Sequence, residues 1–300
     1  MCDGFRILLL IGVLVSWPVA AGEGPIEVTD ELGRSVTLSR PAQRIVALAP
    51  HIVENVYSAG AGDRLVGAVS YSNYPPEAEQ LPRVGSYKAA SVEQILALQP
   101  DLVMMWESGS SRDTLRQLER MGIAVYVGEP NELEDVAEAI RHIGVLAGTE
   151  TVAEQSAERY LERLAQLRAT YSEAESVSVF YQVWNQPLQT LSGQHLISDV
   201  IRLCGGRNIY ADAASIAPVV NMESLLDRNP AVIVASGMGE ERPQWLDEWR
   251  DWPGLTAVRH DNLFFVPPDL IQRHTARILD GAALFCEHID TARQRLAAAP

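Results

Sequence analysis

Two stretches of this sequence repeat one pattern, and the repeat constrains the fold more than any other feature. SVEQILALQPDLVMMW begins at Ser91, and NMESLLDRNPAVIVAS begins at Asn221. In each stretch a polar capping residue opens a short segment, a proline follows, and an apolar run comes after the proline. Two copies of one helix–strand unit predict two lobes that are built alike. The matching residues stand at a constant offset: Glu93 and Glu223, Leu96 and Leu226, Pro100 and Pro230.

Each copy predicts a short helix, a break at the proline and a buried strand. Ser91 is a good N-cap, and Gln94 three residues later gives the sequence pattern of a capping box. Asn221 can cap the second helix, although Ser224 is weaker at the box position. The proline ends each helix because it keeps the preceding residue out of the α region. The apolar run suits a strand covered on both faces of a parallel sheet.

The first residues, MCDGFRILLLIGVLVSWPVAAGEGP, have the features of a secretory signal. Arg6 precedes a short apolar run that Pro18 ends, and the small residues at 19–21 suit cleavage. Cys2 lies before this run, so it cannot be the lipid-bearing cysteine of a lipoprotein. We therefore expect a signal peptide at residues 1–21 and an exported chain. No later stretch is long and apolar enough to span a bilayer.

The charge balance excludes one class of partner. The formal net charge is −15, and Lys88 is the only lysine. So acidic a chain lacks the basic surface that attracts nucleic acids or anionic membranes. We expect neither a nucleic-acid partner nor direct membrane insertion.

Cysteine and histidine usage bears on disulfides and metals. Without the signal peptide, Cys204 and Cys286 remain, and in an exported chain a disulfide is favoured over two free thiols. The six histidines are scattered, and no CxxC or closely paired histidines occur, so no metal site is predicted.

The order of apolar runs indicates the domain organisation. RIVALAP, LVGAVS, LVMMW and IAVYVG predict strands that alternate with helices at 51–59 and 112–121, and an amphipathic segment covers 133–146. Such alternation is typical of a parallel, doubly wound lobe, here assigned to 26–147. A helix-start signal then opens a long helical segment, 148–173, between the repeat copies. SVSVFYQVW, a helix at 197–204, NLFFVPP and a last helix at 276–296 complete a second lobe at 174–300. The predicted fold class is α/β, with two Rossmann-like lobes joined by one long helix.

Motifs of catalysis are mostly missing. GAGDRL at Gly60 follows a helix and lacks the third glycine of a dinucleotide fingerprint, so it is read as a helix end and turn. The sequence contains no GxSxG elbow, P-loop or HExxH motif. We expect no enzyme, with a hydrolase or transferase as the minor alternative.

Aromatic and charged residues follow several predicted strands. Tyr71 comes after LVGAV, Tyr87 precedes the first capped helix, and Trp106 ends its strand. Asp269 and Arg273 follow the last strand. In doubly wound sheets, ligands bind beyond the carboxyl ends of the strands. Core packing would explain one such aromatic residue. Several aromatic and charged residues at strand ends, taken from both halves of the chain, favour a ligand cleft.

The chain resembles the periplasmic substrate-binding proteins of ABC importers, in the group that binds iron-siderophores, haem or cobalamin. The resemblance rests on TDELGRSVTLSRPAQRIVALAP, on SVEQILALQPDLVMMW and on the midway helix, and it extends over the whole mature chain. It implies two α/β lobes with the ligand between them. It also implies a monomeric binding protein that delivers its ligand to a permease dimer.

Within this group the chain is most similar to the cobalamin-binding members. SYSNYPPEAEQLPRVGSY resembles the segment that faces the corrin ring, which carries over to Tyr71 and Tyr87, and Trp106 matches a tryptophan at the next strand end. Asp269 and Arg273 in PPDLIQR match a pair that binds corrin amides. The family disulfide matches Cys204 and Cys286.

Cobalamin is therefore the expected ligand, and it brings its own cobalt and lower base, so no protein cofactor is needed. Tyr87 stands in place of a family tryptophan, so cobinamide remains a possible ligand. Haem is a further alternative, with His274 or Tyr71 as an axial ligand. A ferric siderophore would favour an arginine cluster, of which only Arg273 is plainly placed.

The repeated glutamates are the last prediction. Glu93 and Glu223 each occupy the second residue of a capped helix. A carboxylate there stabilises the helix dipole, which explains each glutamate alone but not their equivalent placement. In the family, such a pair docks on arginines of the two permease subunits. We therefore predict permease docking through Glu93 and Glu223.

Overall fold

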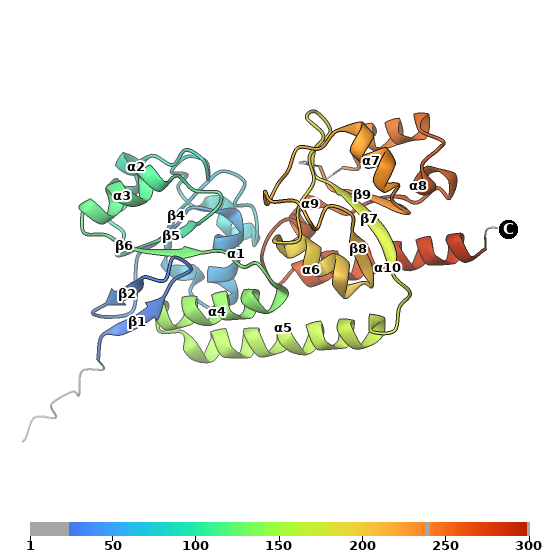
Figure 1. The fold of residues 1–300 in the computed structure, drawn as a ribbon. Coiled ribbons are helices and arrows are strands. Elements are labelled where there is room, and N and C mark those ends of the chain that lie inside the picture. The colour runs from blue at the N-terminus through green and yellow to red at the C-terminus, as the bar shows by residue number, and fades with distance from the viewer. Residues whose placement is uncertain (1–23, 238–240, 299–300) are drawn as a thin grey trace, which may run out of the picture.

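The computed structural model describes residues 24–237 and 241–298 of the chain. The predicted signal peptide at 1–21 lies outside these ranges. Two α/β lobes stand side by side, and the long helix α5 (Glu150–Tyr171) runs along one edge of both (Figure 1). This is the architecture that the repeated unit predicts.

The N-terminal lobe contains a parallel sheet and a small antiparallel hairpin. The hairpin strands β1 (Ile26–Thr29) and β2 (Ser35–Leu38) pair with each other. The sequence analysis does not predict them, because each alternates buried and exposed residues over only four positions. The other elements are β3 (Ile45–Ala47), α1 (Pro50–Ser58), η1 (Gly62–Arg64), β4 (Leu65–Ala68), η2 (Pro76–Gln80), α2 (Val92–Ala97), β5 (Leu102–Trp106), α3 (Arg112–Arg120), β6 (Ala124–Gly128) and α4 (Leu133–Ala147).

The C-terminal lobe follows α5 and contains the second parallel sheet. The tryptophan-rich segment is the 3₁₀ helix η3, and the last helix begins two residues later than predicted. The elements are β7 (Val177–Gln182), α6 (Leu196–Leu203), β8 (Gly206–Asn208), α7 (Met222–Arg228), β9 (Val232–Ala235), η3 (Gln244–Asp251), α8 (Thr256–Arg259), β10 (Leu263–Phe265), α9 (Pro268–Ile271) and α10 (Ile278–Ala297).

The two parallel sheets have the same strand order. The first runs β4-β3-β5-β6 and the second runs β8-β7-β9-β10, with every pair parallel. In each sheet the first strand along the chain therefore lies between the second and the third. At this position the chain changes direction across the sheet, which is where doubly wound folds bind their ligands.

The repeated helices α2 and α7 are capped as predicted. The Ser91 hydroxyl accepts a hydrogen bond from the Gln94 N–H at 3.3 Å, and the Asn221 side chain accepts one from the Ser224 N–H at 2.8 Å. One of the two hydrogen bonds of the capping box predicted at Ser91 is wrong, namely the one from the Ser91 N–H to the Gln94 side chain. The Ser91 N–H donates instead to the carbonyl of Val84 at 2.8 Å, so a neighbouring loop satisfies this donor in place of the Gln94 side chain.

The residue before each proline also repeats. Gln99 has a φ of 48° and Asn229 a φ of 38°, so both leave the right-handed α region as predicted. Both adopt positive φ rather than the extended conformation that usually precedes proline. The two copies thus share their helix ends as well as their helix starts.

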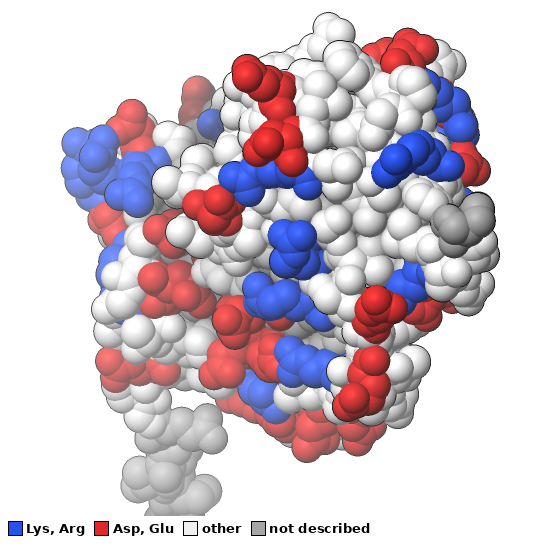
Figure 2. Space-filling model, turned by 45° about the vertical axis from the view of Figure 1, so that its right-hand side comes forward, with Lys and Arg blue, Asp and Glu red and all other residues white. Residues whose placement is uncertain are grey.

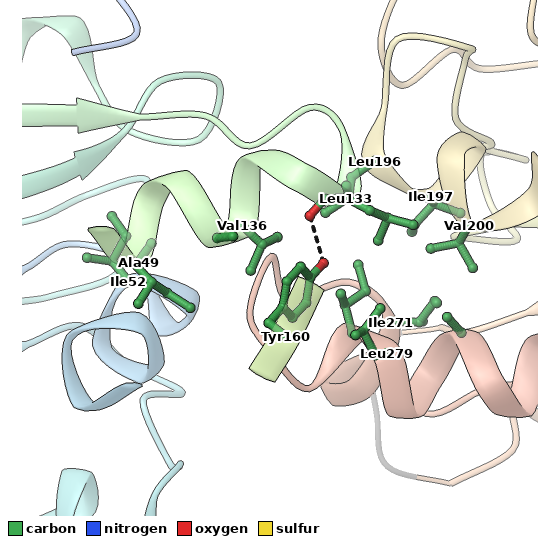
Figure 3. Close-up of a cluster of buried hydrophobic side chains, with 14 of the residues drawn as sticks. Ala49, Ile52, Leu133, Val136, Tyr160, Leu196, Ile197, Val200, Ile271 and Leu279 are labelled. Atoms are coloured by element: carbon green, nitrogen blue, oxygen red, sulfur yellow. Dashed lines mark hydrogen bonds between the residues drawn. The ribbon is translucent and has the colours of Figure 1, made fainter. Parts of the chain in front are cut away.

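The apolar core continues from one lobe into the other. Figure 3 shows side chains of α4 lying against side chains of α6 and of the α9–α10 region. Tyr160 of α5 is part of this cluster, and its hydroxyl donates to the Leu133 carbonyl at 2.7 Å. Because the side chains of α4 and α6 are buried against each other, the lobes are held together by packing as well as by the connecting helix.

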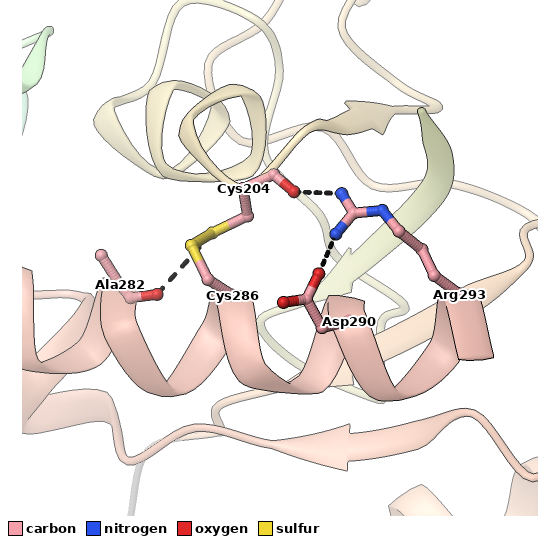
Figure 4. The surroundings of a disulfide bond; sticks show 5 residues. All are labelled: Cys204, Ala282, Cys286, Asp290 and Arg293. Atoms are coloured by element: carbon pink, nitrogen blue, oxygen red, sulfur yellow. Dashed lines mark hydrogen bonds and ion pairs between the residues drawn. A yellow bond between two sulfur atoms is a disulfide. The ribbon is translucent and has the colours of Figure 1, made fainter. Parts of the chain in front are cut away.

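A disulfide joins Cys204, at the end of α6, to Cys286 in α10. Figure 4 shows that the bond lies between the two helices, close to Arg293, whose guanidinium donates to the carbonyl of Cys204. The predicted pairing is confirmed, and it lies wholly within the C-terminal lobe.

Candidate functional site

Residues that follow strands of both lobes meet at the interface between the lobes. Tyr71 and Asn73 follow β4, whereas Asp269 and Arg273 come after β10. The Arg273 guanidinium donates to the Tyr71 carbonyl at 3.2 Å and to the Asn73 side chain at 2.7 Å. The Asn73 amide approaches Asp269 at 3.4 Å. Three of the five sequence-predicted ligand residues are therefore within one hydrogen-bonded group.

Asp269 and Arg273 form an ion pair at 2.8 Å, one turn apart. Arg273 is only 8% exposed, whereas the Asp269 side chain keeps 30% of its surface exposed. The carboxylate is thus open to a ligand, while most of the guanidinium is already engaged by the protein.

Tyr71 touches the other lobe through its backbone carbonyl, and its side chain lies largely in solvent. Its side chain is 79% exposed, and its φ is 67°, a conformation that is unusual for a bulky residue. The hydrogen bond from Arg273 to its carbonyl helps to hold the backbone there. An exposed aromatic ring on a fixed backbone is a suitable surface for a flat ligand.

Tyr87 and Trp106 form a second aromatic group on the N-terminal lobe. Their ring centroids are 5.6 Å apart, with planes tilted by 44°. The edge of Trp106 also meets His51 at 5.3 Å. The indole N–H of Trp106 is buried and has no partner within the described ranges. Both predicted rings lie on the same side of the interface.

Glu54 is a residue of this interface that the sequence analysis missed. It lies in α1 and is 3% exposed, yet its carboxylate meets two arginines of the other lobe, Arg273 at 2.7 Å and Arg277 at 3.5 Å. Burial raises the pKa of Glu54, while the two arginines lower it. The signal in the sequence is weak, because Glu54 stands in HIVENVY with two other polar residues, His51 and Asn55, that are also buried.

Arg277 extends the same cluster outward. Its guanidinium lies over the ring of Tyr74, 3.8 Å from the centroid. The amide of Asn55 donates to the carbonyl of His274 at 2.9 Å. Charged, aromatic and neutral polar groups thus all cross between the lobes at this place.

Three histidines that are far apart in the sequence also gather here. The His274 ring lies 5.4 Å from His51 and 5.3 Å from His195. Burial lowers the pKa of His51 to about 3, helped by Arg273, and lowers that of His195 to about 4. His195 is neutral for a second reason, because its Nδ1 accepts the Ile197 N–H at the start of α6.

This cluster bears on two of the sequence predictions. His274 is 2% exposed, so its ring does not face a ligand as an axial haem ligand would. Over residues 24–237 and 241–298, no group of three or more His, Cys, Asp or Glu side chains is arranged to hold a metal ion. Histidines that are scattered in the sequence can still form a cluster in space. Whether such a cluster is a metal site depends on how its side chains are arranged.

Glu93 and Glu223 lie away from this site. Both are exposed in the first turns of α2 and α7. These helices lie at the same edge of the two lobes, on the side opposite α5 (Figure 1). Two carboxylates on one edge are what docking on a two-subunit partner requires, and docking itself stays a prediction.

Charged side chains of both signs lie on the molecular surface. On the face drawn in Figure 2, basic side chains lie among acidic ones and do not form a continuous basic surface. Such a face offers no extended footprint for a phosphate backbone. In the part of the chain that the structure describes, no helix combines the length and apolar character of a membrane span.

Comparison with known proteins places these features in context. A model of the family described as periplasmic binding protein matches residues 45–270. The vitamin B12-binding protein of Vibrio campbellii is 34% identical over 255 residues, which cover 85% of this chain and 92% of that protein. The periplasmic vitamin B12 binding protein BtuF of Vibrio cholerae, a solved structure, has a TM-score of 0.78 and 34% identity over 84% of this chain and 98% of its own.

Haem-binding proteins share the fold. The periplasmic heme-binding protein RhuT from Roseiflexus sp. RS-1 has a TM-score of 0.74 at 24% identity, over 84% of this chain and 99% of its own. At that identity the likeness extends to the architecture alone.

Proposed function

The chain belongs to the periplasmic binding protein family, and from this premise we propose that it captures cobalamin and delivers it to an ABC transporter permease. The observation that carries the proposal is the pairing of two kinds of surface at one interface. The N-terminal lobe contributes the Tyr87–Trp106 ring pair and the C-terminal lobe an Asp269–Arg273 ion pair, and Trp106 reaches the ring of His274, which follows Arg273 in the chain. The relatives named as vitamin B12-binding proteins support the same ligand.

The chemistry of a corrinoid suits such a site. The ring is broad and flat, so Tyr71, Tyr87 and Trp106 offer it large, rigid contact surfaces. Its edge carries amides, from which Asp269 can accept and to which Arg273 can donate hydrogen bonds. Cobalamin supplies its own cobalt ligands, so the site needs no resident cofactor and no protein ligand to the metal.

Haem is the second candidate, because one observation favours it. The phenol of Tyr71 is on an exposed side chain and could serve as an axial ligand to iron. Haem carboxylates would also meet Arg273, although that guanidinium already has two acidic partners. Cobinamide remains the corrinoid alternative to cobalamin. We propose a binding protein and no enzyme.

The place of action and the partner follow from the same proposal. A cleaved signal at 1–21 would export the chain to the periplasm, where it acts as a monomer. We assign the N-terminal lobe to 26–147, the connecting helix to 148–173 and the C-terminal lobe to 174–300. The loaded protein would then dock on a permease dimer through Glu93 and Glu223, one carboxylate for each subunit.

The absorption spectrum of the purified protein tests the ligand. The protein is incubated with cyanocobalamin or with haem, desalted and scanned. A retained corrin spectrum supports the proposal. A Soret band after haem incubation, with no corrin retained in the parallel sample, would replace cobalamin by haem.

A further inference from the structure

Four charged side chains form one cluster where the lobes meet. Glu54 contacts Arg273 at 2.7 Å and Arg277 at 3.5 Å, and Arg273 also contacts Asp269 at 2.8 Å. The side chains of Glu54 and Arg273 are 2% and 10% exposed. Three of the four residues belong to the C-terminal lobe, and only Glu54 comes from the N-terminal lobe.

The charges of this cluster cancel. Two guanidinium groups face two carboxylates, so the group carries no net formal charge. Cancellation matters here because water screens buried charges poorly, and an uncompensated guanidinium would attract any anion strongly. Once compensated, the same guanidinium still has N–H groups to offer a carbonyl oxygen, but it no longer favours a carboxylate over an amide.

We propose that Glu54 is a specificity-determining residue, which makes the site select a ring edged with carboxamides over one edged with carboxylates. The inference rests on the proposed function, since it concerns the corrinoid site. Asp269 compensates Arg273 as well, but its more exposed side chain is open to a ligand. Among the residues that the structure describes, the charged partners of Glu54 are the two arginines, so it acts through them as a positioning residue.

Two corrinoids with the same ring provide matched probes. Cobinamide carries carboxamide side chains, whereas cobyrinic acid carries the corresponding carboxylic acids. The measurement is the ratio of their dissociation constants at pH 7, by titration of the purified full-length mature protein. If Glu54 had a merely structural role, its substitution would weaken the binding of both probes and leave the ratio of their dissociation constants unchanged. A change in selectivity would change that ratio.

Three different ratios are expected among four proteins, because the control should match the wild type. The wild type should prefer cobinamide. Glu54→Gln keeps the side-chain shape but leaves one unbalanced positive charge, so its ratio should shift toward cobyrinic acid by about tenfold or more. Arg277→Gln leaves one unbalanced negative charge and should shift the ratio the opposite way. Glu154→Gln removes a carboxylate from an exposed pair with Arg141, far from the interface, and should leave the ratio unchanged.

The outcomes separate this inference from the proposed function. Opposite shifts in the two cluster variants support it, and the Arg277→Gln shift is sufficient evidence if Glu54→Gln does not fold. A wild type that binds cobinamide, with ratios in both variants within about twofold of its own, overturns the inference alone. A wild type that binds neither corrinoid overturns the proposed function, and the inference with it.

Discussion

The two lobes share a framework and differ in the chemistry at their strand ends. Both sheets have the same strand order, and both carry a capped helix that ends in a positive-φ residue before a proline. The N-terminal lobe presents Tyr71, Tyr87 and Trp106 at the interface. The C-terminal lobe presents Asp269 and Arg273 there, and it alone contains the disulfide.

This difference shows which features a duplicated unit can change. The helix starts and strand order determine where the backbone goes, and both copies keep them. Side chains at the carboxyl ends of the strands are not needed for that framework, so each lobe can carry different groups there. In our proposal one lobe supplies a flat apolar surface and the other supplies directional hydrogen bonds, whereas the docking glutamates remain equivalent.

Reversing both docking charges should have the largest effect. Glu93→Arg with Glu223→Arg should abolish uptake of the corrinoid, because the introduced guanidinium at each position would repel the permease arginine that the native carboxylate would bind. Corrinoid affinity should stay at the wild-type value, since neither residue lies at the interface between the lobes. Transport is measured in a strain that lacks its own binding protein, and affinity by calorimetry.

The single reversals, Glu93→Arg and Glu223→Arg, test whether the two lobes contribute equally to docking. Each should weaken docking by a similar amount if the two carboxylates are equivalent, and added salt should weaken the wild-type complex. If the double variant still supported wild-type uptake, Glu93 and Glu223 would have no role in docking and would only stabilise their helix dipoles.

Removing the disulfide should destabilise the C-terminal lobe, where the bond lies. Cys204 and Cys286 are 82 residues apart in the sequence, and in the chain-entropy model closing such a loop contributes about 4–5 kcal/mol. Cys204→Ser with Cys286→Ser should lower the free energy of unfolding by up to that amount, measured by urea denaturation. Two titratable thiols in the oxidised, denatured wild type would show that the bond does not form in solution.

Acid should destabilise the interface through its buried histidines. His51 and His195 have folded-state pKa values of about 3 and about 4, below the ordinary value of 6.5. As pH falls below 6.5 the unfolded chain binds protons first, so stability decreases from there toward pH 4 and is unaffected at higher pH. At pH 5 the two residues together should cost about 4 kcal/mol.

A variant isolates this effect from other titrating groups. The loss of unfolding free energy between pH 7 and pH 5 should be smaller in His51→Gln than in the wild type by about 2 kcal/mol. Equal losses in the two proteins would mean that His51 is not buried in the neutral form.

Truncating one residue from each lobe should have the smallest effect of the series. Trp106→Ala should weaken corrinoid binding by about 1–3 kcal/mol, because it removes an aromatic surface that the ligand would cover. Arg273→Ala should weaken it as well, through lost hydrogen bonds and through the buried partners left behind. Calorimetry that finds wild-type affinity in both variants would remove this interface as the binding site.

The sequence determined the framework of this protein. Apolar runs, capping residues and prolines act over a few neighbouring residues, so the strands after Pro100 and Pro230 and the caps at Ser91 and Asn221 were predictable from local pattern. The equivalence of the lobes followed from the repeat itself. The disulfide was predictable because an exported chain with two cysteines has only one intramolecular pairing to make.

Only the tertiary structure decided what meets at the interface. Glu54 looks like one of several polar residues in a short helix, and its two arginine partners lie more than two hundred residues further along the chain. Likewise His51, His195 and His274 are scattered in the sequence and adjacent in space. No local pattern encodes such contacts, because they arise when two separately folded sheets are brought together by the packing of α4, α5 and α6. The charge balance of the site is therefore a property of the assembled lobes.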